Sequence, residues 1–175
     1  MRPSQPTAAA ADLDWPAMAL LHLPRRTGGR PRTTPVNPHT QLDQQPTDPR
    51  LPVELARRVF ALPGVVEQPS RISVAGARAL TLAPGEPLGP PEAFMIGSEF
   101  AHVHPAPDHS LHAMLPPEIV AAVLDAGWGE PHPVAGMGLL PATAVMLYAP
   151  RDEAELGVVE CLVRTSHAFA RPAVP

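Results

Sequence analysis

Residues Glu99–His112 read EFAHVHPAPDHSLH and hold four of the chain's eight histidines. Two runs that favour strands, 94–104 and 110–115, flank a short proline-containing loop, so we expect an antiparallel pair. Side chains alternate across a strand, which places His102 and His104 on one face of the first strand. In one register His112 joins them from the second strand. The positions left for the buried face are apolar: Ala101, Val103, Leu111 and Leu115.

The rest of the ordered chain mixes strands with helices. Apolar residues recur at helical spacing from Leu51 to Leu62, before a stop at Pro63-Gly64. A second helix is expected after Pro117, with Gly127 as a left-handed end, and a third opens with Asp152-x-x-Glu155, the spacing of a capping box. Strand-like runs are expected at 65–68, 71–76, 79–83, 94–104, 110–115 and 143–150, with a long loop at 128–142. The order predicts an α+β fold, a mostly antiparallel sheet of five or six strands covered by about three helices.

The first 49 residues show no sustained hydrophobic period and contain many prolines. We therefore predict a disordered, proline-rich arm at 1–49 and a folded domain at 50–171. The chain has 26 prolines, and all 13 of its basic residues are arginine, a composition typical of a GC-rich, bacterial genome. An apolar patch at 15–23 interrupts the arm.

Composition also limits the partners. The net charge of −4 comes without a basic cluster in the domain, which argues against nucleic acid. No apolar run is long enough for a bilayer, so we expect no membrane segment and a cytoplasmic protein. The single cysteine, Cys161, excludes an internal disulfide and is expected to be a buried thiol. The oligomeric state stays open.

Three converging imidazoles offer two kinds of chemistry. His102, His104 and His112 are candidate ligands for a divalent metal, zinc or iron, and without metal they are candidate general bases. Asp108 is a candidate ligand or an orienting carboxylate. Glu99 reaches the same face only through a β-bulge, which Gly97 would allow. A third interpretation is that the histidines only satisfy one another in a polar network. We interpret His22, His39, His109 and His167 as surface or structural residues.

Two further stretches contain candidate site residues. In GWGEPHP, 127–133, Trp128 is a candidate wall for a planar ligand or a cap on the core, and His132 is held between two prolines. In YAPR, 148–151, Tyr148 ends a strand, and Arg151 is a candidate for binding a substrate anion. The alternative for Arg151 is an ion pair with Asp152, Glu153 or Glu155.

Taken together, the motifs E-x-A-H-x-H, D-x-S-L-H, G-W-G-x-x-H-P-x-A-G and Y-A-P-R-x-E-x-E resemble the fungal luciferase family from about Glu99 to Phe169. The resemblance is weaker over 51–83. It implies addition of molecular oxygen to a hydroxylated pyrone, followed by loss of carbon dioxide and emission of light. Carried over by position, it implicates a set of nine residues: Glu99, His102, His104, Asp108, His112, Trp128, His132, Tyr148 and Arg151.

The chain departs from the family in two respects. The fungal enzymes begin with a membrane-anchoring apolar helix where this chain has a proline-rich stretch, and the pyrone is a fungal metabolite. We therefore expect a shared site more than light emission. The first hypothesis is an oxygenase-type enzyme acting on a small enolic or aromatic molecule, and the second is a non-catalytic module that binds a metal or small ligand. The sequence leaves the substrate and cofactor open.

Overall fold

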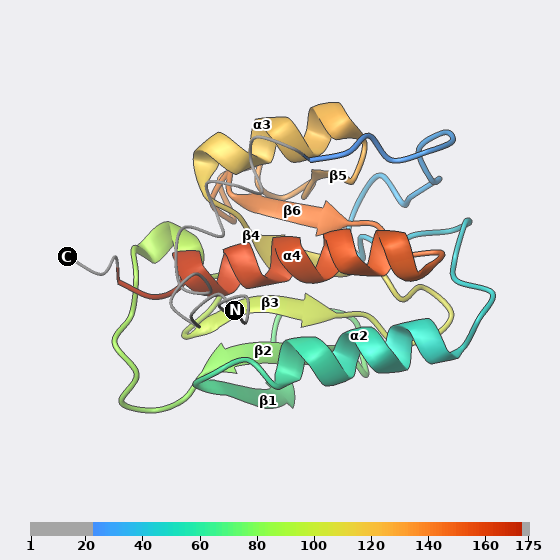
Figure 1. The fold of residues 1–175 in the computed structure, drawn as a ribbon. Helices are drawn as coiled ribbons and strands as arrows, with labels where there is room; N and C mark the ends of the chain where they lie inside the picture. Colours follow the sequence, from blue (N-terminus) through green and yellow to red (C-terminus); the bar gives the residue numbers. More distant parts are fainter. Residues whose placement is uncertain (1–22, 173–175) are drawn as a thin grey trace, which may run out of the picture.

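The computed structural model describes residues 23–172, and within them a single sheet carries all named strands (Figure 1). Its order is β1-β2-β3-β4-β6-β5, and every neighbouring pair is antiparallel. The strands are β1 Val65–Pro69, β2 Arg78–Leu82, β3 Glu99–Val103, β4 Leu111–Met114, β5 Gly129–Pro131 and β6 Ala144–Leu147. The α-helices are α2 Arg50–Phe60, α3 Pro117–Ala126 and α4 Glu153–Phe169, with a short 3-10 helix at Pro91–Ala93. The predicted α+β class is confirmed.

One face of the sheet forms the hydrophobic core. Helices α2 and α4 lie side by side across this face, and α3 lies beside β5 (Figure 1). Ala101, Val103, Leu111 and Leu115 point into the core, as their alternation in the sequence predicts. Burial of such side chains is the main favourable term in folding. Because this face is apolar, the opposite face of β3 and β4 is left for the histidines.

The helix ends follow the local chemistry of the chain. Gly127 adopts a left-handed conformation with φ of 81° at the end of α3, a conformation that costs glycine little. At the start of α4, the Asp152 side chain accepts a hydrogen bond from the backbone N–H of Glu155, 2.8 Å away. Both helix ends match the sequence predictions.

Two segments differ from the predicted strands. Residues 71–76 form a loop, because the backbone N–H of Ser70 bonds the carbonyl of Ala77 and closes the β1–β2 hairpin around them. The short strand β5 lies inside the predicted loop 128–142. It pairs with the edge of β6 that β4 leaves open.

Residues 23–49 pack against the domain, which corrects the prediction of a disordered arm for this part of 1–49. Arg26 N–H bonds the carbonyl of Ala126, and Trp128 Nε1 donates to the carbonyl of Pro24 at 2.5 Å. Further along, His39 and Gln41 are buried. The remaining 22 residues of the predicted arm, with His22 and most of the apolar patch, lie outside the described residues.

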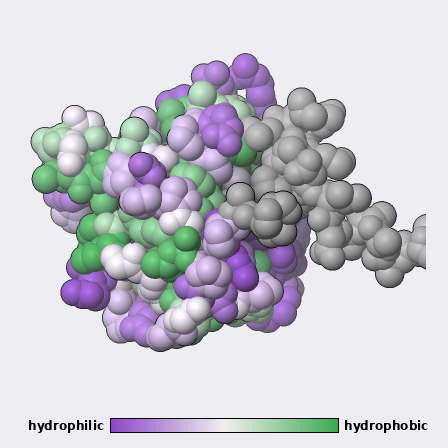
Figure 2. All heavy atoms as spheres, turned by 90° about the vertical axis from the view of Figure 1, so that its left-hand side faces the viewer, coloured by the Kyte–Doolittle hydropathy of each residue, from purple (hydrophilic) through white to green (hydrophobic). Residues whose placement is uncertain are grey.

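The large hydrophobic side chains that are exposed among residues 23–172 come mostly from loops. They are Val36, Leu42, Val53, Ile72, Leu88, Met137 and Leu139, and of these Val53 belongs to a helix. Figure 2 shows hydrophobic residues interleaved with hydrophilic ones on one side of the molecule. Ile72 is the member of this set that reaches the site described below.

Candidate functional site

The histidines of β3 and β4 meet on the sheet face opposite the core. His102 pairs directly with His112, and the backbone N–H of His104 bonds the carbonyl of Ser110 at 2.9 Å. This is the register in which the sequence predicts that all three imidazoles share one face of the sheet. His102 Nε2 lies 2.9 Å from His112 Nδ1, and all three rings are buried. The predicted convergence of the three imidazoles is therefore present in the structure.

Glu99 reaches the same face through an irregularity in β3. Thr81 of β2 pairs with Glu99, whereas Leu80 pairs with Ala101, so Phe100 is an extra residue in β3. A bulge of this kind reverses the side-chain alternation locally. The Glu99 carboxylate consequently lies 2.8 Å from His102 Nδ1, and it also accepts a hydrogen bond from the Ser70 hydroxyl. The bulge expected near Gly97 lies instead at Phe100.

Asp108 orients His104. Its Oδ2 lies 2.5 Å from His104 Nδ1, and its Oδ1 accepts hydrogen bonds from the backbone N–H groups of Ser110 and Gln41, both at 3.1 Å. Burial opposes ionisation of Asp108, but the bonds from His104 and Ser110 lower its pKa overall. The ionised carboxylate therefore accepts a hydrogen bond from the Nδ1–H group of His104. His104 Nε2 is buried and has no hydrogen-bond partner among residues 23–172.

A fourth imidazole comes from the N-terminal segment. His39 Nδ1 lies 3.1 Å from His112 Nε2, and His39 Nε2 lies 2.7 Å from a Glu130 carboxylate oxygen. Glu130 also accepts hydrogen bonds from Tyr148 and Thr33. His39 was not predicted as a site residue, because it lies in an aperiodic, proline-rich stretch of the sequence. Glu130 was not predicted either, because it lies on the unpredicted strand β5. No local pattern marks either residue.

His132 completes the group of five rings. Its ring centroid lies 4.4 Å from that of His112 and 5.3 Å from that of His39. Its Nδ1 accepts a hydrogen bond from the backbone N–H of Val134 at 3.3 Å. In the neutral ring, Nε2 then carries the proton and is a donor. We call His39, His102, His104, His112 and His132 the histidine cluster.

The histidine cluster borders a cavity of about 320 Å³. A cavity of this size suits a small organic molecule. The loop that follows β1 and the segment before His39 supply the other walls, so that imidazoles face apolar and small polar side chains. The lining residues are Asn37, Pro38, His39, Ile72, Ser73, Val74, His102, His104, His112 and His132.

Burial keeps members of the histidine cluster neutral. It lowers the pKa of His102 and lowers that of His112 well below the ordinary value, because removal of water penalises the charged ring. Burial, together with the charges of neighbouring histidines, lowers the pKa of His132 to about 4. Near pH 7 these rings therefore offer lone pairs and N–H groups and carry no positive charge.

Three predicted binding residues lie outside the described cavity lining. Trp128 is buried in the core and anchors Pro24 through its indole N–H, which corresponds to the alternative of a cap on the core. Tyr148 donates to Glu130 at 2.9 Å and so supports the carboxylate behind His39. Burial, with Glu130 beside it, raises the pKa of Tyr148, so its hydroxyl stays protonated.

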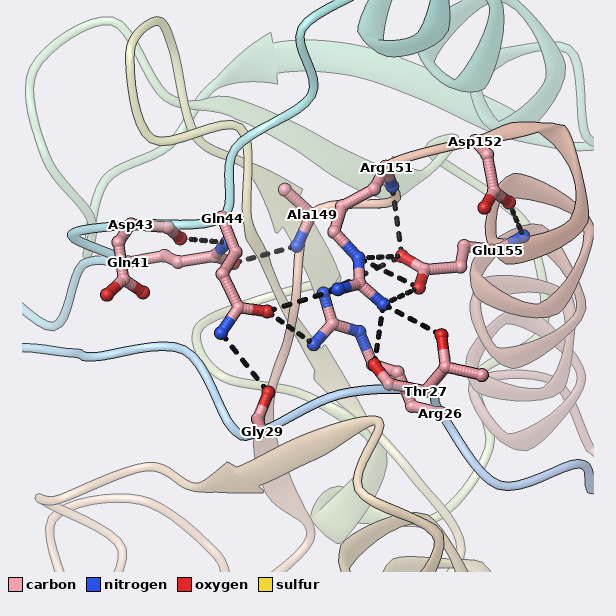
Figure 3. Close-up of polar contacts among 10 residues, drawn as sticks. All are labelled: Arg26, Thr27, Gly29, Gln41, Asp43, Gln44, Ala149, Arg151, Asp152 and Glu155. Atoms are coloured by element: carbon pink, nitrogen blue, oxygen red, sulfur yellow. Dashed lines mark hydrogen bonds and ion pairs between the residues drawn. The ribbon is translucent and has the colours of Figure 1, made fainter.

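Arg151 belongs to a separate polar network (Figure 3). Its guanidinium pairs with Glu155 and donates to the carbonyl of Thr27 and the side chain of Gln44. Arg26, from the N-terminal segment, lies 3.6 Å from the same Glu155 carboxylate. The ion-pair alternative for Arg151 is therefore the arrangement observed. The network joins the N-terminal segment to the start of α4.

The structure agrees with the sequence interpretation for two of the remaining residues and differs from it for two others. His109 is half-buried with φ of 59° and is absent from the cavity lining. His167 donates to the carbonyl of Pro63, a structural role. His39 is the exception, since it belongs to the histidine cluster. Cys161 is half-buried, where the sequence predicted a buried thiol.

Comparison with known proteins agrees with the sequence motifs. Residues 97–166 match the family model described as Luciferase domain. The chain is 32% identical over 163 residues to a luciferase of Armillaria gallica, covering 84% of this chain and 60% of that protein. A luciferase of Neonothopanus nambi is 37% identical over 102 residues, covering 53% of this chain and 38% of that protein.

The chain thus spans less than two thirds of the length of these relatives. No solved structure gives a significant match. Within residues 23–172, none of the helices has the length and apolar character needed to cross a membrane.

Proposed function

We propose that the chain is a small-molecule enzyme of oxygenase type, a proposal supported by the match of residues 97–166 to the Luciferase domain model and by the similarity to fungal luciferases. The substrate class is an enolic or aromatic molecule that ionises to an electron-rich anion. The observation that carries the proposal is the histidine cluster itself. Five imidazoles border one cavity, and three of them are backed by carboxylates that fix their orientation: Glu99, Asp108 and Glu130.

The first step is ionisation of the enol. The nitrogens of His102, His104 and His112 converge at the cavity wall, and His104 Nε2 has a lone pair without a partner among the described residues. The enol proton is taken up at this point, and the Asp108 carboxylate on the far side of the His104 ring stabilises the charge that results. His132 donates its Nε2–H to the developing oxyanion.

The second step joins the anion to oxygen. A carbon of the enolate forms a bond to molecular oxygen, two electrons pass from the substrate to the oxygen molecule, and the proton held by the site is returned to the peroxide. The product of this step is an organic hydroperoxide, so atoms and charge balance.

Oxygen consumption tests the proposal. Purified protein is offered a panel of 4-hydroxy-2-pyrones, catechols and phenols, and oxygen uptake is followed with an electrode. We expect turnover with at least one enol, and a decrease of about 10²- to 10⁴-fold in His104→Gln, the range for loss of an acid–base group. His109→Asn is the matched control, since His109 is a neighbour in sequence but does not line the cavity. Wild-type activity in His102→Gln, His104→Gln and His112→Gln would refute the proposal.

The alternative is a module that binds a small ligand or metal without chemistry. The same cluster supports it, because carboxylate-backed imidazoles bind as well as react. Tight binding of an enol without oxygen uptake would favour this alternative over the enzyme.

A further inference from the structure

A chain of hydrogen bonds in the histidine cluster lacks one proton. It runs from Glu99 through His102, His112 and His39 to Glu130, with four contacts of 2.8, 2.9, 3.1 and 2.7 Å. Each contact requires one proton between its two heavy atoms. Three neutral imidazoles carry three protons, and the two carboxylates carry none. The four contacts therefore need one proton more than neutral rings supply.

His104, in the same cluster, has a buried ring nitrogen without a hydrogen-bond partner among residues 23–172. Its single ring proton is engaged by Asp108, which leaves the lone pair of Nε2 buried and without a partner in the described part of the chain. Buried polar atoms in native proteins nearly always have a partner, so such an atom calls for an explanation. One nitrogen from each of His102, His104 and His112 lies within 4.8 Å of the others.

We infer that a divalent transition-metal ion binds at His102 Nε2, His104 Nε2 and His112 Nδ1. The ion replaces the missing proton between His102 and His112 and gives His104 Nε2 its partner. His102 and His104 then donate Nδ1–H to Glu99 and Asp108. His112 donates Nε2–H to His39, which donates its own Nε2–H to Glu130. Every contact now holds one proton, and every ring is neutral.

The surroundings of these nitrogens match those of known metal sites. A histidine ligand usually donates a hydrogen bond from its second ring N–H to a carboxylate or carbonyl. Here His102 and His104 donate directly to carboxylates, and His112 donates to His39, which donates to Glu130. Three imidazoles with an open position are typical of catalytic zinc, and imidazole also suits iron, copper and nickel. Tetrahedral coordination at 2.0–2.1 Å separates ligand nitrogens by about 3.3 Å. The 2.9 Å between His102 and His112 would widen only slightly.

A competing group of ligands exists in the same cluster. Nitrogens of His39, His112 and His132 also lie within 4.8 Å of one another. A metal there would likewise take the place of the missing proton, but it would leave His104 Nε2 unpartnered. It would also need a lone pair on His132, whose Nδ1 lone pair already accepts from Val134. A metal held by His102, His104 and His112 accounts both for the missing proton and for the unpartnered His104 Nε2. We assign the ion to this group for that reason.

This inference deepens the proposed function, because a metal at this position would lower the pKa of a bound enol. The open coordination position faces the cavity, which the three ligand residues line. With the ion bound, the His104 Nε2 lone pair is taken up by the metal, so the substrate would ionise at the ion and the enol proton would pass to solvent water. In metal-free protein, the proton would pass to His104 Nε2 as described above.

Metal binding tests the inference without any assay of activity. Full-length protein, freed of tags and treated with chelator, is titrated with Zn²⁺ by calorimetry, and bound metal is counted by elemental analysis. We expect one equivalent in the wild type. We expect at least a 100-fold loss of affinity in His102→Gln and His104→Gln and a 10- to 100-fold loss in Asp108→Asn. His132→Gln should stay within a few-fold of the wild type. Circular dichroism and thermal unfolding verify that each variant folds.

The opposite pattern, with affinity lost in His39→Gln and His132→Gln and retained in His104→Gln, would overturn the assignment. No stoichiometric binding in the wild type would overturn the inference altogether. Oxygen uptake, measured on metal-loaded and metal-free protein, separates the two proposals. Turnover in protein shown to lack metal would refute a requirement for the metal in the reaction, but it would leave the proposed enzyme activity standing. A bound metal without turnover on any enol would count against the enzyme alone.

Discussion

At the residue scale, the site depends on a position that has no room for a side chain. This position is Gly129. A Cβ built on Gly129 would lie 2.2 Å from the carbonyl oxygen of Met146, a backbone atom on the neighbouring strand. Glu130 follows directly and pairs across the sheet with Met146. The glycine therefore allows β5 to approach β6 closely enough to hold Glu130 behind His39.

Two glycine substitutions should change stability in opposite directions. Gly129→Ala should lower the free energy of unfolding by about 3 kcal/mol, because the clash involves a backbone that can give way only by separating the strands. Gly157→Ala, at an exposed position of α4 with nothing within 4 Å, should raise it by about 0.5–1 kcal/mol, because alanine favours the helix. Urea unfolding measures both. Equal effects of the two substitutions would contradict this account of Gly129.

At the element scale, the N-terminal segment 23–49 matters as much to the site as the strands. It supplies His39, and Gln41 donates its backbone N–H to Asp108. The segment is held by the network of Figure 3, in which Arg26 and Glu155 are both buried. Burial lowers the pKa of Arg26, and Glu155 opposes that effect. A buried charge of this kind depends on its partner.

Removal of that partner should therefore loosen the segment. Glu155→Gln leaves the buried Arg26 and the adjacent Arg151 without their carboxylate and should lower the free energy of unfolding by about 3 kcal/mol. Hydrogen exchange should accelerate in residues 23–49 before it does in β3 and β4. Glu153→Gln is the matched control, since Glu153 is exposed and 3.8 Å from Arg58, and its effect should stay within about 0.5 kcal/mol. Equal losses in both variants would show that the buried network does not hold the segment.

At the scale of the whole molecule, the sheet separates two environments. One face is apolar and covered by α2 and α4. The other holds the histidine cluster, with residues 37–39 and 72–74 forming the remaining walls of its cavity. Histidine also occurs on the core side, where His167 packs near Phe100 and donates to the carbonyl of Pro63. Burial lowers the pKa of His167. The nearby Arg171 and Arg164 add to this effect, and the bond to Pro63 and the charge of Glu86 oppose it.

Stability should consequently decrease in mild acid. The pKa of His167 is lower in the folded protein than its ordinary value of about 6.5 in an unfolded chain. The unfolded state therefore binds more protons, and the free energy of unfolding falls as pH drops below about 6.5. His167→Gln keeps an N–H donor for Pro63 but does not titrate. Urea unfolding at pH 7.5 and 5, in the presence of chelator, should show a smaller loss in the variant, by at most about 1.4 kcal/mol per pH unit. An identical loss in both proteins would exclude His167 as a source.

Much of this protein was predictable from local sequence. Alternation of side chains placed His102, His104 and His112 on one face and the apolar residues of β3 and β4 on the other, and both placements are present in the structure. The helix ends at Gly127 and Asp152 followed from local backbone chemistry. The separated motifs lie in or beside residues 97–166, the part of the chain that matches the family model described as Luciferase domain. These features depend on residues a few positions apart, where periodicity carries the information.

Only the tertiary structure decided which distant residues join them. His39 is 73 positions from His112, and Glu130 is 91 positions from His39, so no period relates them. Arg151, by contrast, has the chemistry of an anion-binding residue, and packing places it against Glu155 in a different network. Contacts between segments far apart in the chain form only when the whole core assembles, because their closure costs entropy that local interactions do not offset. The position of each ring in the histidine cluster therefore belongs to the fold, although three of its five members were visible in one short stretch.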